Sequence, residues 1–188
     1  ESKPKNLTTA QKKQVFANAS GWVLEAGSAL SGNDNTDADP EVLVAIGELS
    51  TSIGAADITE VEMVTTTADK SEGFTISVRV RYNEPVNVVT TGGTPTLAVT
   101  NSNAGSGSGR GPHSLSYASG TGTNELIFSL AIAAANAATN ADDVLSVGAQ
   151  TIALNSGTIK DASGTASDAA LVISGALGTA AGTVTVTA

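Results

Sequence analysis

The stretch Phe74-Thr-Ile-Ser-Val-Arg-Val-Arg-Tyr82 alternates apolar and polar side chains along its whole length. In an extended chain successive side chains point to opposite faces, so the apolar residues share one face and the polar ones, including Arg79 and Arg81, share the other. This pattern is typical of a strand in an antiparallel sheet with one buried and one solvated face. Between residues 126 and 132 the spacing of two recurs in Leu126, Phe128, Leu130 and Ile132. Two long strands are therefore the expected centre of the fold.

Shorter candidate strands extend this expectation on both sides. They are residues 61–66, 86–89, 96–100, 114–118, 144–147, 151–154 and 183–187. Turn-forming sequences separate them, among them Gly92-Gly93, Gly120-Thr-Gly122 and Asn155-Ser-Gly157. Many short strands at this spacing predict an antiparallel sandwich or barrel, and nothing in the order of elements suggests a βαβ crossover. A solenoid is the alternative architecture, although no internal repeat is evident.

Composition favours a β-rich or assembly protein. The 188 residues are 40% apolar but only 3% aromatic, so Val, Ile, Leu and Ala must fill the core. Nine basic residues against 18 acidic ones give a net charge of −9, which argues against nucleic acid and anionic membranes as partners. The uncharged stretch 169–188 has Thr and Val in alternation near its end, so we expect strands there rather than a membrane span. Without cysteine, the chain forms neither disulfides nor thiolate metal sites.

Signals for helices are confined to the N-terminal region. Thr8 and Gln11 have the spacing of a capping box, which predicts a short helix over about 9–19. The change from helical to alternating periodicity near residue 58 divides the chain into an N-terminal docking arm, 1–57, and a β-rich domain, 58–188.

A second helix is predicted over about 40–53. Asp39 is suited to the N-cap, Pro40 to the first helical position and Gly54 to the residue after the end. The apolar residues between them recur at spacings of three and four: Val42, Leu43, Ile46, Leu49 and Ile53. The apolar face of such a helix needs a partner surface.

Four phrases in the β-rich region resemble bacterial immunoglobulin-like repeats of surface adhesins and phage structural proteins. They are Thr75-Ile-Ser-Val-Arg-Val-Arg-Tyr-Asn-Glu-Pro-Val86, Gly93-Thr-Pro-Thr-Leu97, Ser116-Tyr-Ala-Ser-Gly-Thr-Gly-Thr-Asn-Glu-Leu-Ile-Phe128 and Leu154-Asn-Ser-Gly-Thr-Ile-Lys-Asp-Ala-Ser-Gly164. The resemblance covers about 60–175 and departs from the usual repeat in the loop 101–112. It implies an antiparallel immunoglobulin-like β-sandwich, here preceded by an arm with one or two short helices.

The N-terminal region is similar to virion structural proteins of marine, cyanobacteria-infecting tailed phages. The similarity rests on Lys5-Asn-Leu-Thr-Thr-Ala-Gln11, Ala19-Ser-Gly-Trp-Val-Leu24 and Asp39-Pro-Glu-Val-Leu-Val-Ala-Ile46. It implies a capsid decoration or head-stabilising protein of the virion, assembled in the host cytoplasm and bound to the major capsid protein or other virion proteins. Homo-oligomers are expected, and a bacterial cell-surface location is the alternative.

The residues expected to dock on a partner are the apolar ones of this arm: Trp22, Val23, Leu24, Val42, Leu43 and Ile46. Buried aromatic and aliphatic anchors carry most of the binding energy at protein interfaces. For Trp22, packing within the chain is the simpler interpretation. Two other functions remain open: a carbohydrate- or host-surface-binding module, and a surface filament in which the strand near 183–188 completes a neighbour's sheet.

No motif favours an enzyme. His113 is the single histidine and lies in Arg110-Gly-Pro-His-Ser114, where a Ser-His-Asp arrangement with Ser114 is conceivable. The chain nevertheless lacks the G-x-S-x-G sequence that exposes a nucleophilic serine. Gly105-Ser-Gly-Ser-Gly109 lacks the Lys-Ser/Thr ending of a phosphate-binding loop and is expected to be flexible. The prediction is a protein without catalytic residues or cofactors.

The acidic turn around Asp34, Asp37 and Asp39 offers hard oxygen ligands within one loop, so Ca²⁺ is a candidate ligand. The spacing lacks the Gly and Glu of an EF-hand, so a solvated acidic loop is the simpler expectation. Asp142-Asp143 is a second candidate of the same kind.

Overall fold

A computed structural model describes residues 6–18, 21–45, 55–103, 111–135, 139–162 and 166–188. The described chain is mainly β, as the alternating sequence predicts. It divides into two compact units. The described part of the N-terminal unit ends at Ala45, and the larger unit begins at Ala55.

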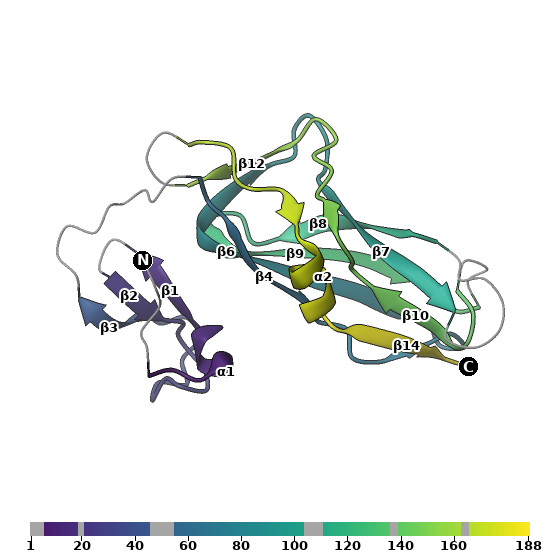
Figure 1. Cartoon of the computed structure of the whole chain (residues 1–188), viewed down its shortest axis with the longest axis horizontal. Coiled ribbons are helices and arrows are strands. Elements are labelled where there is room, and N and C mark those ends of the chain that lie inside the picture. Colours follow the sequence, from purple (N-terminus) through teal and green to yellow (C-terminus); the bar gives the residue numbers. More distant parts are fainter. Residues whose placement is uncertain (1–5, 19–20, 46–54, 104–110, 136–138, 163–165) are drawn as a thin grey trace. The chain divides into compact units, whose positions relative to one another are not determined.

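Most of the larger unit is one curled sheet (Figure 1). Its strands pair in the order β12-β6-β9-β8-β7-β10-β14-β5, and β4 pairs with β6 beside this path. All of these pairs are antiparallel except β14 with β5. The bounds are β4 (Ile58–Met63), β5 (Ala68–Asp69), β6 (Phe74–Val89), β7 (Thr96–Asn103), β8 (His113–Ser119), β9 (Thr123–Ile132), β10 (Asp143–Ser146), β12 (Thr158–Asp161) and β14 (Thr183–Thr187). Strands β11 (Gln150–Thr151) and β13 (Val172–Ile173) pair with each other.

The long strand β6 organises this sheet. Its first half lies between β4 and β9, and its last four residues pair with β12. The ladder to β9 becomes irregular between Arg81 and Val86, where Pro85 has no N–H to donate. Residues 86–89, expected as a separate strand, are therefore the end of β6.

The core follows from the register of β6 and β9. Val78 lies opposite Phe128 and Val80 opposite Leu126, and all four side chains are fully buried. The Tyr117 ring meets the Phe128 ring edge-on, with 6.1 Å between centroids. Both long strands predicted from alternation are thus confirmed, and their apolar face is the buried one.

A short helix, α2 (Gly175–Ala180), lies in a stretch where the sequence indicates only strands. Ser174 caps it by accepting a hydrogen bond from the Leu177 N–H at 3.2 Å. Two of its six residues are glycine, which weakens any helical signal. Gly178 is needed for packing, because a Cβ there would lie 2.3 Å from the carbonyl oxygen of Gly148.

The N-terminal unit is a helical turn followed by a three-stranded antiparallel sheet. The elements are α1 (Thr9–Lys12), β1 (Val15–Asn18), β2 (Gly21–Leu24) and β3 (Glu41–Ala45), with β2 in the middle of the sheet. The capping box of Thr8 and Gln11 is present as predicted. The helix predicted over 9–19 is nevertheless wrong beyond Lys12, because Val15 pairs with Leu24 and both become buried in the sheet.

The helix predicted over 40–53 is wrong where the structure describes it. Residues 41–45 form strand β3, whose backbone pairs with β2. The run Val42-Leu43-Val44 is consistent with this result, since β-branched residues fit a pleated strand better than a helix. Residues 46–53 of the predicted helix, including Ile46, Leu49 and Ile53, lie outside the described residues.

The placement of Phe128 predicts a large effect of truncating it. Phe128→Ala should lower the free energy of unfolding by about 3–5 kcal/mol, because it leaves a cavity beside Val78 and Tyr117. Val89→Ala is the control: Val89 is half exposed, and its truncation should change stability by about 0.5 kcal/mol or less. Urea denaturation measures both, and equal effects would contradict the position of Phe128 in the core.

Candidate functional site

The residues expected to dock on a partner divide into two groups. Val23 and Leu24 on β2 are buried, and Trp22 is half-buried. On β3, Val42 is 50% exposed and Leu43 is 39% exposed. Ile46 lies outside the described residues. Only Val42 and Leu43 of the described members therefore have the exposure that a docking residue needs.

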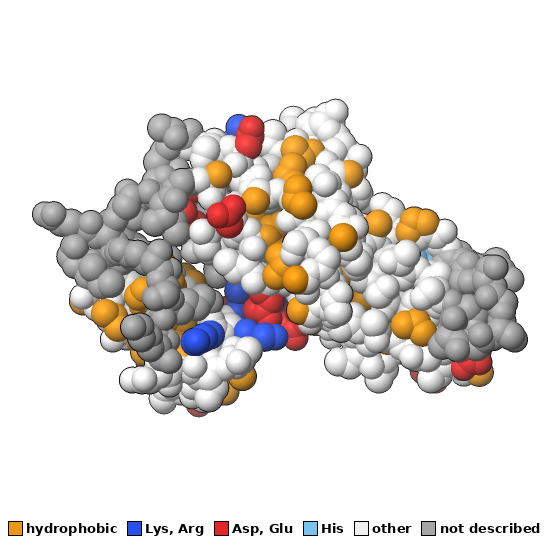
Figure 2. All heavy atoms as spheres, in the orientation of Figure 1, with side chains coloured by type: hydrophobic (Ala, Val, Ile, Leu, Met, Phe, Trp, Pro, Cys, Tyr) orange, Lys and Arg blue, Asp and Glu red, His pale blue; other side chains and the backbone are white. Residues whose placement is uncertain are grey.

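Val44, which the sequence pattern does not single out, is also 41% exposed. We call Val42, Leu43 and Val44 the β3 patch. Exposed hydrophobic side chains are seen in Figure 2 where Figure 1 places the β3 end of the N-terminal unit. Three consecutive exposed aliphatic residues form a contiguous surface of the kind that marks interaction sites.

A β-bulge explains how three consecutive residues of one strand all reach solvent. Trp22 pairs with Val44 but Val23 pairs with Val42, so Leu43 is an extra residue on β3. A bulge breaks the strict alternation of faces and re-aims the side chains around it. β3 is also the outer strand of its sheet among the described residues, so only β2 covers its backbone there.

The acidic loop that precedes β3 is ordered by its own side chains. The Asn35 N–H donates to Asn33 Oδ1 and the Asp37 N–H to Asn35 Oδ1, each at 3.0 Å. Ser31 Oγ donates to Glu41 Oε1 at 2.6 Å and so ties the loop to the start of β3.

The three aspartates suggested as calcium ligands, Asp34, Asp37 and Asp39, lie in this loop at or near the surface. Across the described ranges, no group of three or more His, Asp or Glu side chains is close enough to hold a metal ion. The loop therefore places negative charge beside the β3 patch but does not gather these carboxylates into a metal centre.

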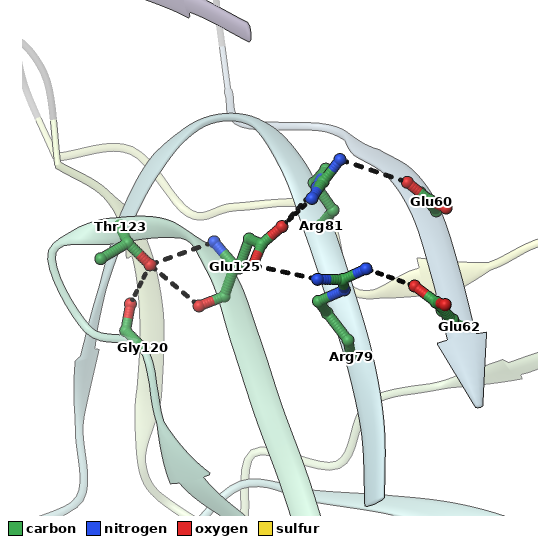
Figure 3. Close-up of polar contacts among 7 residues, drawn as sticks. All are labelled: Glu60, Glu62, Arg79, Arg81, Gly120, Thr123 and Glu125. Carbon is green, nitrogen blue, oxygen red and sulfur yellow. Dashed lines mark hydrogen bonds and ion pairs between the residues drawn. The ribbon is translucent and has the colours of Figure 1, made fainter. Parts of the chain in front are cut away.

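Among the described residues of the larger unit, the most extensive polar cluster is a ladder of ion pairs across three strands (Figure 3). Its members are Glu60 and Glu62 on β4, Arg79 and Arg81 on β6, and Glu125 on β9. Arg79 pairs with Glu62 and reaches Glu125 at 3.5 Å. Arg81 pairs with Glu125 through two nitrogens and reaches Glu60 at 3.5 Å. Glu125 thus bridges both arginines.

Strand register assembles this ladder. Arg81 lies opposite Glu60 on one side and Glu125 on the other, and Arg79 lies opposite Glu62. Thr123 helps to fix the backbone of Glu125, since its hydroxyl accepts a hydrogen bond from the Glu125 N–H (Figure 3). The single proton of this hydroxyl lies between the carbonyl oxygens of Gly120 and Glu125, which are 2.8 and 2.9 Å from Oγ1.

The ladder differs from an ordinary surface ion pair in its burial. The Arg81 side chain is only 6% exposed and that of Glu125 19%. Burial lowers the pKa of Arg79, but the negative charges of Glu125, Glu62 and Glu60 raise it by more. The pKa is therefore above its ordinary value, and the guanidinium stays charged. Arg79 and Arg81, which share the polar face predicted for this strand, thus pair with acidic neighbours on β4 and β9. The bridging role of Glu125 was missed, because it lies 44 residues from Arg81 in sequence.

The conceivable pair of His113 with Ser114 is not formed. Neighbouring strand residues point to opposite faces, and on β8 His113 is buried while Ser114 is exposed. Asp142 and Asp143 separate in the same way: Asp143 is fully buried and Asp142 exposed. The Gly/Ser run 105–109 lies outside the described residues.

Comparison with known proteins returned no significant match to a family model, a curated protein or a solved structure. Within the described residues, neither helix has the length and apolar character that a membrane-crossing helix requires.

The ladder predicts an unequal response to neutralising two carboxylates. Glu125→Gln should lower the free energy of unfolding by about 3 kcal/mol, because it leaves the buried Arg81 charge poorly compensated. Asp168→Asn is the matched control: its partner Lys160 lies 2.8 Å away, but Asp168 is 86% exposed, so the expected loss is below about 1 kcal/mol. Chemical denaturation of the two variants compares them. Similar losses would mean that Glu125 does not hold β6 to β9.

Proposed function

We propose that the chain is a structural protein of a tailed-phage virion, a capsid decoration or head-stabilising protein. In this proposal the N-terminal unit binds the shell and the larger unit, with an immunoglobulin-like sandwich architecture, projects from it. The major capsid protein or another virion protein is the partner, and copies associate with one another on the particle. The virion assignment rests on the resemblance of the N-terminal sequence to virion structural proteins.

The β3 patch is the observation that carries the docking role. Val42, Leu43 and Val44 leave a run of aliphatic surface in solvent on an outer strand, and contact with another protein would remove it from water. The bulge at Leu43 argues against simple strand addition, because bulges protect outer strands from pairing. Docking through side chains is therefore the favoured mode.

Simultaneous binding of many copies compensates for the low affinity of one small patch. When many copies bind a symmetric shell and also touch one another, each contact raises the local concentration for the next. A patch of three aliphatic side chains is then sufficient on a particle although it is weak in a single complex.

The alternative of a carbohydrate-binding module has less support. Sugar rings stack on exposed aromatic faces, but Tyr82 and Phe128 are buried in the core of the larger unit. Phe74 and Tyr117 pack against that core, and the Tyr117 hydroxyl accepts a hydrogen bond from the Thr121 N–H at 2.8 Å. These four are all the aromatic residues after the N-terminal region.

The filament alternative requires the C-terminal strand to leave its own chain. β14 is paired on both sides, with β10 and with β5. Val184 and Val186 are also buried in the core. Donating this strand to a neighbour would break both pairings and expose these residues, which argues against that route to a filament.

Charging the β3 patch should abolish attachment. The double variant Val42→Lys/Val44→Lys should bind bare particles of the encoding virus at least tenfold more weakly than the unmodified chain, because Lys cannot be buried unpaired. Val172→Lys, at a 64% exposed position of the larger unit, should bind normally. Cosedimentation with the particles measures both.

A result in which the double variant folds and binds normally would contradict the docking role of β3. The virion assignment has a separate test, which is the presence of the chain in gradient-purified particles from a culture that produces it. A fixed ratio to the major capsid protein supports the assignment, and absence from the particles contradicts it.

A further inference from the structure

A layer of buried polar side chains lies at one end of the core of the larger unit. Three neighbouring strands, β8, β7 and β10, each contribute one polar residue at the end of an inward-facing apolar row. These residues are His113 before Leu115, Asn101 after Val99, and Asp143 before Leu145. Thr139, which precedes β10, is also fully buried. We call Asn101, His113, Thr139 and Asp143 the polar layer.

The contacts of His113 suit a neutral imidazole ring. His113 Nε2 lies 3.3 Å from Asn101 Nδ2 and 3.4 Å from Thr139 Oγ1. Because an amide N–H faces it, Nε2 acts as the acceptor. A proton on Nε2 would set a donor against a donor, so the Asn101 amide would have to turn over or move away.

Asp143 is the one charge that acts on this ring among the described groups; Asn101 from β7 and Thr139 are neutral. Asp143 Oδ2 accepts a hydrogen bond from the Asn140 N–H at 2.7 Å. Asp143 Oδ1 is buried without a hydrogen-bond partner in the described structure. Burial lowers the pKa of His113 and Asp143 raises it by less, so the pKa stays below its ordinary value.

We propose that the polar layer is an acid-sensitive latch, in which protonation of His113 opens the ends of β7, β8 and β10 while the rest of the larger unit stays folded. His113 and Asp143 are the first residues of their strands, and Asn101 lies near the end of β7. Strand ends can open without unfolding the sheet they belong to. The latch does not depend on the proposed virion role.

The direction of the pH effect follows from linkage. The closed form holds the pKa of His113 below 6.5, so the open form binds the proton more readily. Opening therefore becomes more favourable as the pH falls through about 6.5, and it levels off below the pKa of the closed form. Each unit of difference between the two pKa values increases the opening constant about tenfold.

Two measurements on the full chain test the latch together. Because His113 is the only histidine, its ring signals in an NMR titration give the pKa of the closed form directly. Hydrogen exchange at pH 7.5 and pH 5.0, corrected for intrinsic rates, gives the opening of residues 99–103, 113–116 and 143–146. The increase in the opening constant at pH 5.0 should equal the factor that the measured pKa implies. The backbone amides that pair β6 with β12 should exchange equally at both pH values.

His113→Gln keeps a side chain that hydrogen-bonds but does not titrate, so its exchange at these strand ends should not change between the two pH values. The latch is overturned if His113 titrates at or above 6.5, if the glutamine variant keeps the response, or if all strands open together. Should the variant fail to fold at pH 7.5, the titration and exchange of the unmodified chain still decide the matter.

Discussion

The alternation of side chains along β6 is the constraint on which the larger unit depends. One face of the strand supplies Ile76, Val78 and Val80 to the core, and the other presents Arg79 and Arg81 to acids on β4 and β9. A shift of one residue would bury the arginines among aliphatic side chains and expose the valines. One register therefore builds both the core and the ion-pair ladder, and each stabilises the pairing that the other requires.

Those features of the fold that depend on local pattern could be predicted from the sequence. The strand around Val78 alternates fully, the strand around Phe128 has apolar residues at every second position, and the predicted turn at 120–122 does join β8 to β9. Features that depend on pairing between distant segments could not: the bridging position of Glu125 follows from a register set across 44 residues. The buried environment of His113 likewise depends on β7, β8 and β10 meeting at one end of the core.

The N-terminal unit shows why short elements are harder to predict. Apolar spacing in 40–53 fits a helix, yet Val42 and Leu43 lie in a five-residue strand whose bulge disrupts the period of two. Of the residues expected to dock on a partner, Val42 and Leu43 on β3 are exposed. Val23 and Leu24 are buried within the N-terminal unit, and Trp22 is half-buried. The neighbouring Val44 completes a patch that only the bulge reveals. This exposed aliphatic surface is the basis for proposing that the N-terminal unit docks on another protein.

The most direct test of that role is hydroxyl-radical footprinting of residues 42–44 in the free chain and in its native assembly. Val42, Leu43 and Val44 should be oxidised readily in the free chain and protected several-fold in the assembly, while Val172 should react equally in both. Equal oxidation of the β3 patch in the two states would contradict the claim that another molecule covers it.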